Sequence, residues 1–129
     1  MKSENLPKIK ILALIYEPRL HAIFPQVLCI ENTLESLKKI IGCDYVACTE
    51  IEIAGKNFDV WSDDEALLQE NPVPNLYIND NLILFGNLIF ANHDEEGETT
   101  GLTVADIHLI QIFVQKQFQK MKKYFGRKK

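Results

Sequence analysis

The chain has 129 residues, of which 47% are hydrophobic and 25% are charged, a balance typical of a soluble globular protein. This length favours one domain, and no apolar run approaches the roughly 18 residues of a membrane-spanning helix. The three cysteines are an odd number, which argues against a disulfide framework and favours a reducing compartment. We therefore expect one cytoplasmic domain over residues 1–129 that does not enter a membrane.

The charges are unevenly distributed along the chain. Residues 116–129 contain seven of the 14 lysines and arginines and no acidic residue. Residues 1–115 carry the other seven basic residues and all 18 acidic residues, a formal balance of −11, although the whole chain has a net charge of only −4. An acidic body with a basic, helical C-terminal end indicates interaction with a charged partner.

The first elements form a predicted hairpin. Residues 8–15 (KIKILALI) favour a strand that begins half exposed and ends buried on both faces, and residues 27–30 return as its partner. Pro18 marks the turn between them, because it fixes its own φ angle and disfavours the helical region for Glu17. Pro25 cannot donate a hydrogen bond to a neighbouring strand, so we expect it at a sheet edge or at the start of a strand.

A helix is predicted over residues 33–41, with a signal at each end. Asn32 is the expected N-cap, and Glu35 three residues later supports it at the positive end of the helix. Gly42 is expected to end the helix in a left-handed conformation. The buried stripe should consist of Leu34, Leu37, Ile40 and Ile41.

A second hairpin and a short helical turn follow. Residues 44–53 and 58–61 predict two antiparallel strands. The segment SDDE at residues 62–65 is a capping pattern, and we expect one helical turn at residues 66–68.

The next segment is rich in apolar residues. Residues 76–78 favour a short strand, and residues 82–91 form a nearly continuous apolar run of strand character. Gly86 within this run indicates a bulge or the close approach of another backbone. Residues 92–101 (NHDEEGETTG) are expected to form a loop.

The last helix is predicted to begin at the Thr103–Asp106 capping pattern and to end at Gly126. Its inner stripe should consist of Ile107, Ile110, Val114, Phe118, Met121 and Phe125. The order of elements is therefore ββαββ, further strands and a final helix. This order predicts an α+β fold with a small antiparallel sheet and the two main helices on one face.

Several of these segments resemble one protein family. They are Glu17-Pro18, IENTLESLKKIIGCDYV (30–46), VWSDDEALLQENPVPN (60–75), FGNLIFA (85–91) and GLT (101–103). Over about residues 9–110 they are similar to the bacterial domain of unknown function 3846. Cys43-Asp44 departs from the family, in which a second glycine or small turn residue commonly follows the helix. The resemblance implies no catalytic residue. It implies a setting, because such proteins are found in prophages, plasmids and conjugative elements.

Patterns typical of catalysis or metal binding are weak. The chain has no phosphate-binding glycine loop, no Gly-x-Ser-x-Gly and no His-Glu-x-x-His. Its histidines lie far apart, and Cys43 and Cys48 have no second pair, so zinc binding is not expected. Residues 94–98 lack the spacing of a calcium loop. We expect no catalytic, cofactor-binding or metal-binding residue.

Two charged sets are the candidate partner-binding residues. The acidic set consists of Asp63, Asp64, Glu65, Asp94, Glu95 and Glu96. The basic set consists of Lys116, Lys120, Lys122, Lys123, Arg127, Lys128 and Lys129. Structural roles also explain these residues: helix capping for the first acidic triplet, a solvated loop for the second, and favourable charge at a helix C-terminus for the lysines.

Three functions remain open. We favour a non-enzymatic accessory protein that binds a protein partner, which in one form is a second copy whose acidic body receives the basic helix. The second function is nucleic-acid binding through the basic end, with a steep dependence on salt. The third is a small-ligand-binding (counter-defence) protein or an enzyme, which would need a pocket with convergent polar groups near Trp61, Asn75 and Gly86.

Overall fold

The computed structural model describes residues 7–20, 22–69, 72–79 and 82–126, with side chains as far as Lys123. Arg127, Lys128 and Lys129 of the predicted basic set lie outside the described residues, as does the side chain of Phe125. In chain order the elements are β1 (Lys8–Glu17), β2 (Ala22–Glu31), α1 (Leu34–Ile41), β3 (Val46–Ile53), β4 (Lys56–Asp63), the 3₁₀ helix η1 (Ala66–Leu68), β5 (Pro74–Asn79), β6 (Leu82–Phe85), β7 (Leu88–His93), β8 (Thr99–Thr100) and α2 (Val104–Gly126).

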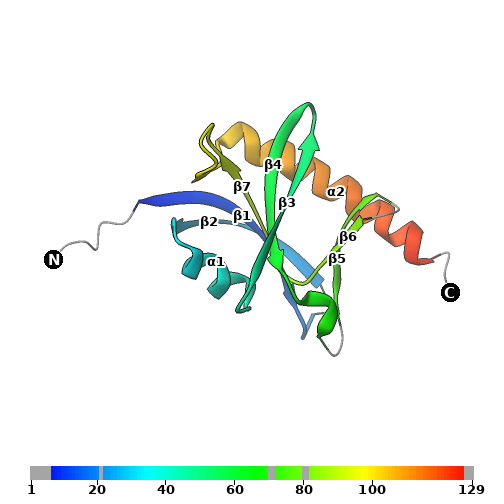
Figure 1. Cartoon of the computed structure of the whole chain (residues 1–129). Coiled ribbons are helices and arrows are strands. Elements are labelled where there is room, and N and C mark those ends of the chain that lie inside the picture. Colours follow the sequence, from blue (N-terminus) through cyan, green and yellow to red (C-terminus); the bar gives the residue numbers. More distant parts are fainter. Residues whose placement is uncertain (1–6, 21, 70–71, 80–81, 127–129) are drawn as a thin grey trace.

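The described strands form a main sheet and a small second sheet. The main sheet has the order β2-β1-β7-β4-β3, and β8 pairs with the end of β7. The hairpin of β5 and β6 is a separate two-stranded sheet, which lies beside α2 in Figure 1. Every described pairing is antiparallel. The predicted α+β class with an antiparallel sheet is confirmed.

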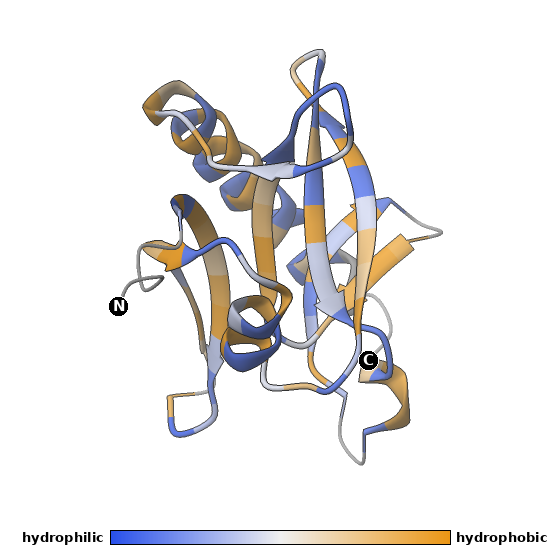
Figure 2. Ribbon diagram, turned by 60° about the vertical axis from the view of Figure 1, so that its left-hand side comes forward, coloured by the Kyte–Doolittle hydropathy of each residue, from blue (hydrophilic) through white to orange (hydrophobic). Residues whose placement is uncertain are grey.

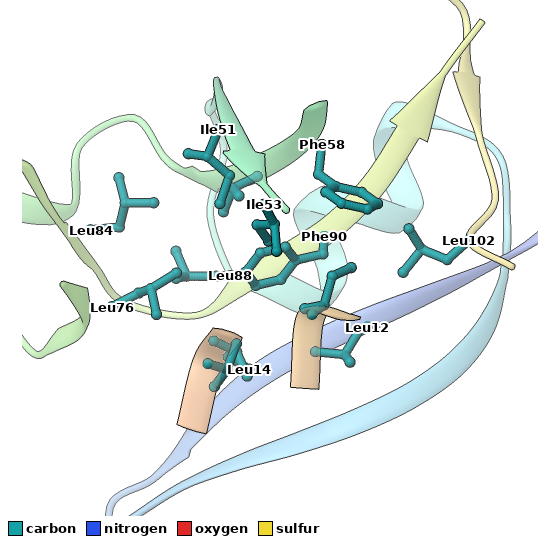
Figure 3. Packing of buried hydrophobic residues seen from close by; sticks show 13 residues of the cluster. Leu12, Leu14, Ile51, Ile53, Phe58, Leu76, Leu84, Leu88, Phe90 and Leu102 are labelled. Atoms are coloured by element: carbon teal, nitrogen blue, oxygen red, sulfur yellow. The ribbon is translucent and has the colours of Figure 1, made fainter. Parts of the chain in front are cut away.

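One face of the main sheet packs against α2 and the β5–β6 hairpin. Leu12 of β1, Phe58 of β4 and Phe90 of β7 are fully buried there together with Ile110 of α2. Leu76 extends the same cluster into the hairpin. Figure 3 shows Leu12, Phe58, Leu76 and Phe90 converging from their separate strands. This cluster is the larger of the two apolar cores.

The opposite face of the sheet packs against α1. Successive residues of a strand point to opposite faces, so Ile11 of β1 and Ile89 of β7 turn away from α2 and pack with Leu37 and Ile41 of α1. Figures 1 and 2 show the two helices on opposite sides of the sheet. The prediction of both helices on one face is therefore wrong, because the central strands are apolar on both faces and each face needs its own cover.

β2 is an edge strand, as its proline requires. It pairs with β1 from Ala22 to Glu31 without interruption, and Pro25 faces Leu14. The backbone N–H of Tyr16, two residues further along β1, donates to Asn87 immediately before β7. Backbone groups two residues apart point to the same side of a strand, so Leu14 and Pro25 do not bond each other and the missing N–H of Pro25 faces the free edge. The expected edge position of Pro25 is confirmed. The proline also interrupts the free row of donors that would otherwise pair with another chain.

The N-cap of α1 is Thr33 rather than the expected Asn32. Thr33 Oγ1 accepts a hydrogen bond from the Ser36 backbone N–H at 3.1 Å. The Asn32 side chain instead donates to the Thr99 carbonyl at 2.8 Å, which ties the start of α1 to β8. Leu34, expected in the buried stripe, is 50% exposed in the first turn. Gly42 ends the helix with φ at 83°, as predicted.

The apolar run at residues 82–91 forms two strands. Gly86 has φ at 80°, a conformation that few other residues adopt, and it separates β6 from β7. The fully buried Asn75 donates to the Gly86 carbonyl at 2.6 Å, which holds β5 against this break. The expected loop at residues 92–101 contains β8, which pairs with the end of β7.

The first turn of α2 is fixed by Asp106, whose side chain is almost fully buried. Its backbone N–H donates to Thr103 Oγ1 at 3.0 Å and the Thr103 N–H donates to Asp106 Oδ2 at 2.9 Å, so the predicted capping pattern is confirmed. Lys56 Nζ at 2.5 Å and Asn92 Nδ2 at 2.8 Å donate to the same carboxylate. Burial alone would raise the pKa of Asp106, but the hydrogen bonds from Lys56, Thr103 and Asn92 outweigh it and lower the pKa to about 2.

Replacing Asp106 with asparagine should lower the free energy of unfolding by roughly 2 kcal/mol at neutral pH, because it removes the ion pair with Lys56 and weakens the cap. A carboxyl group with a lowered folded pKa stabilises the protein above its unfolded pKa, near 3.8, and this contribution is lost as the pH falls towards about 2. Denaturant unfolding at neutral pH and across that acidic window measures both effects. Equal stability of variant and wild type at neutral pH would contradict this role of Asp106.

Candidate functional site

The first acidic triplet lies where β4 ends and η1 begins. We call residues 63–69 the η1 corner; Figure 1 shows η1 at one end of the main sheet. Three surface hollows of about 400, 420 and 390 Å³ meet at this corner, and Asp63 lines all three. Charged side chains and several hollows therefore coincide at the η1 corner.

Local hydrogen bonds give the η1 corner its shape. Asp63 Oδ1 accepts the Glu65 backbone N–H at 2.8 Å, and the Asp64 backbone N–H donates to the Tyr45 carbonyl at 2.9 Å. The expected helical turn at residues 66–68 is present as η1, closed by a bond from the Leu68 N–H to the Glu65 carbonyl at 3.0 Å. Asp63 thus serves the backbone, while Asp64 and Glu65 are exposed.

Large apolar side chains stand beside these carboxylates. Leu67 is 67% exposed and Leu68 is 79% exposed. Tyr45, immediately before β3, is also exposed, at 62%. The 420 Å³ hollow is lined by both leucines, by the acidic triplet and by residues 83–85 of β6, and none of its described lining residues is basic. This combination of an apolar floor and an acidic rim suits a segment that carries both apolar and cationic side chains.

The other two hollows differ in chemistry. The 400 Å³ hollow is lined by Tyr16, Gly86 and Asn87 together with residues of the η1 corner. Of the three residues expected near a ligand pocket, Gly86 therefore lines a hollow. Asn75 is buried and donates a hydrogen bond to the Gly86 carbonyl, and neither Asn75 nor Trp61 lines this hollow. The 390 Å³ hollow mixes charges, because Lys38 and Lys39 of α1 line it together with the acidic residues.

The second acidic triplet lies at the other end of the sheet. Asp94, Glu95 and Glu96 form the turn between β7 and β8, and Asp94 Oδ1 accepts the Glu96 and Glu98 backbone N–H groups at 2.9 Å. β7 runs antiparallel to β4, with Ala91 opposite Asp59. The two triplets are therefore about 20 Å apart along the strands. The structure does not bring the six predicted acidic residues together into one site.

The described lysines of the basic set are exposed on α2. Ile110, Val114 and Gln117 form the buried side of the helix, and the Gln117 amide donates to the Tyr77 carbonyl at 2.7 Å. This buried glutamine interrupts the predicted apolar stripe and fixes how α2 is rotated against β5. Lys116, Lys120, Lys122 and Lys123 consequently lie on the solvent side of the helix.

A polar cluster on three neighbouring strands was not predicted from the sequence. His93 Nδ1 of β7 lies 3.0 Å from Asp59 Oδ2 of β4, which raises the pKa of His93, first through the hydrogen bond and then through the negative charge. The pKa of the Cys48 thiol on β3 is raised to about 11. The largest cause is burial, followed by the negative charge of Asp59 and a hydrogen bond with it. The Cys48 thiol is therefore protonated at neutral pH, and this environment is the opposite of one that activates a nucleophile.

Two further observations concern the described residues only. No group of three or more His, Cys, Asp or Glu side chains among them is placed to hold a metal ion. None of the described helices is both long enough and apolar enough to cross a membrane.

The comparisons with known proteins give one match. A family model described as "Domain of unknown function (DUF3846)" matches residues 9–119. No curated protein and no solved structure matches the chain. The matched region contains both acidic triplets and Lys116 but stops before Lys120, so the basic end lies largely outside it.

Replacing Asp59 with asparagine should lower the pH at which His93 titrates, towards about 6.5. In the wild type the pair stabilises the folded state below the unfolded histidine pKa, and this contribution disappears as the pH rises through the higher folded pKa of His93. NMR titration of the His93 ring protons measures the midpoint in both proteins. Identical midpoints in two folded proteins would show that Asp59 does not act on His93 in solution.

Proposed function

We propose a function from the surface of the molecule, because the chain belongs to the family of the domain of unknown function DUF3846, whose description assigns no activity. The protein is a non-enzymatic accessory protein that binds a protein partner at the η1 corner. The observation that carries the proposal is the exposure of Leu67 and Leu68 beside Asp63, Asp64 and Glu65. The resemblance to proteins of prophages, plasmids and conjugative elements adds a setting in the cytoplasm of a host bacterium.

The two kinds of side chain at the corner contribute differently to binding. Burying a fully exposed leucine stabilises a complex by roughly 1.5–3 kcal/mol, whereas an exposed ion pair contributes about 0–1 kcal/mol. Leu67 and Leu68 would therefore supply most of the affinity, and the carboxylates would select the partner and accelerate its approach. The partner segment is expected to present one or two large apolar residues flanked by lysine or arginine.

Affinity capture with paired variants tests this proposal. The chain offers a matched control, because Asp64→Lys/Glu65→Lys and Glu95→Lys/Glu96→Lys change the net charge equally at opposite ends of the sheet. A bacterial protein that binds the η1 corner should be retained by the wild type and by the Glu95/Glu96 variant. The Asp64/Glu65 variant and a Leu67→Ser/Leu68→Ser variant should each retain it at least about tenfold less well.

The same experiment can refute the proposal. Circular dichroism must first show that all variants fold, because substitutions at the η1 corner lie next to the end of β4 in the main sheet. If every folded variant then retains the same proteins as the wild type, the η1 corner is not the binding site. If both charge variants lose the same proteins equally, net charge rather than the corner decides retention.

A second candidate function is nucleic-acid binding by α2. It is favoured by the exposure of Lys116, Lys120 and Lys122, none of which forms an ion pair with another described residue. In addition, α2 contains no acidic residue after Asp106. A lysine-rich helix of this kind can follow a phosphate backbone without reading its sequence.

Titration with duplex and single-stranded DNA at several salt concentrations distinguishes this candidate. Affinity falls as salt rises, and each lysine that contacts a phosphate makes the slope of log affinity against log salt steeper by about one. Lys116→Gln/Lys120→Gln should therefore make this slope shallower by about two. Removing residues 127–129 and neutralising Lys122 and Lys123 should abolish binding. The absence of binding by the wild type at low salt would eliminate this candidate.

A further inference from the structure

The solvent side of α2 carries an ordered stripe of its own. Residues four apart in a helix lie one above the other, so Ile112, Lys116 and Lys120 share one side of α2. Ile112 is 43% exposed and both lysines are exposed. Ile110, Val114 and Gln117 hold the opposite side of the helix against the core. We call Ile112, Lys116 and Lys120 the outer stripe of α2.

The outer stripe has the chemistry that the η1 corner requires of a partner. It offers one large apolar residue followed by two cations at successive turns of a rigid helix. The 420 Å³ hollow offers Leu67 and Leu68 beside the exposed carboxylates of Asp64 and Glu65. Within one chain the two surfaces do not neutralise each other, because neither Lys116 nor Lys120 forms an ion pair with a described carboxylate. Both remain available to another molecule.

We infer that the chain binds a second copy of itself through the outer stripe of α2 on one copy and the η1 corner on the other. This inference rests on the proposed function, since it names the partner of that same corner. In the contact, Ile112 covers Leu67 and Leu68, while Lys116 and Lys120 face Asp64 and Glu65. If each copy gives and receives one contact about a two-fold axis, association stops at the dimer; otherwise it continues into longer assemblies.

Two features of the contact determine how strong it should be. Exposed charge pairs are weakened by salt, because ions screen charges separated by more than about 10 Å at 0.1 M and about 3 Å at 1 M. The apolar part consists of three residues rather than an extended surface. We therefore expect weak, reversible association, which becomes roughly tenfold weaker between about 50 mM and about 500 mM salt.

A charge exchange between the two surfaces tests the inference directly. Sedimentation equilibrium of the full-length chain measures association of the wild type, of Asp64→Lys/Glu65→Lys and of Lys116→Glu/Lys120→Glu. Each variant alone should sediment as a monomer, because it carries two surfaces of like charge. An equimolar mixture of the two variants should associate again, because the inverted stripe of one copy then meets the inverted corner of the other. The Glu95→Lys/Glu96→Lys variant should associate as the wild type does.

The outcomes separate this inference from the proposed function. A monomeric wild type at low salt, or a mixture that stays monomeric, overturns the inference. If the Lys116/Lys120 variant associates like the wild type but no longer binds DNA, the stripe is a nucleic-acid surface and the inference is also overturned. Whichever of these outcomes overturns the inference, the proposed function stands if the Asp64/Glu65 variant still loses a captured protein that the Glu95/Glu96 variant retains. It falls with the inference if no property depends on the corner.

Discussion

The fold depends on two central strands, β1 and β7, that are apolar on both faces. Ile11 and Leu12 are neighbours in sequence, yet both are fully buried, in different clusters. Such strands are stable in water only when each face of the sheet is covered. One short helix covers one face, and one long helix together with a small hairpin covers the other. The positions of the remaining elements follow from this need for cover on two sides.

The η1 corner is a consequence of the same arrangement. The chain leaves the main sheet at the end of β4 and must cross to the small hairpin before it returns as β7. Asp63 accepts the Glu65 backbone N–H at this exit. The predicted side-chain cap is absent, because Glu65, the N-cap residue of η1, makes no capping hydrogen bond with its side chain. Leu67 and Leu68 belong to neither apolar cluster and stay exposed. Exposed leucines that the core does not use are available for an intermolecular contact.

The charges are sorted less simply than the sequence suggests. Antiparallel pairing of β4 with β7 sends the two acidic triplets to opposite ends of the sheet, so they cannot act as one surface. Near the first triplet, the lysines at the end of α1 line one of the three hollows, which makes that side of the corner mixed in charge. Only the side towards β6 keeps an acidic rim over an apolar floor. Of the lysines of α2, Lys116 and Lys120 share one side of the helix, because they are four residues apart.

The sequence by itself determined the features whose causes lie within a few residues: the first hairpin, the edge position of Pro25, the end of α1 at Gly42, the cap of α2 and the family. Capping, turn formation and strand alternation are local, so a single segment contains all of their causes. The tertiary structure alone decided which face each helix covers, the pairing of Asp59 with His93 and the bond of Gln117 to β5. These depend on contacts between residues far apart in the chain, where the packing of several elements rather than the preference of one fixes the neighbour. The same holds for the η1 corner: the sequence supplied its carboxylates, and only the route of the chain from the main sheet to the small hairpin left two leucines exposed beside them.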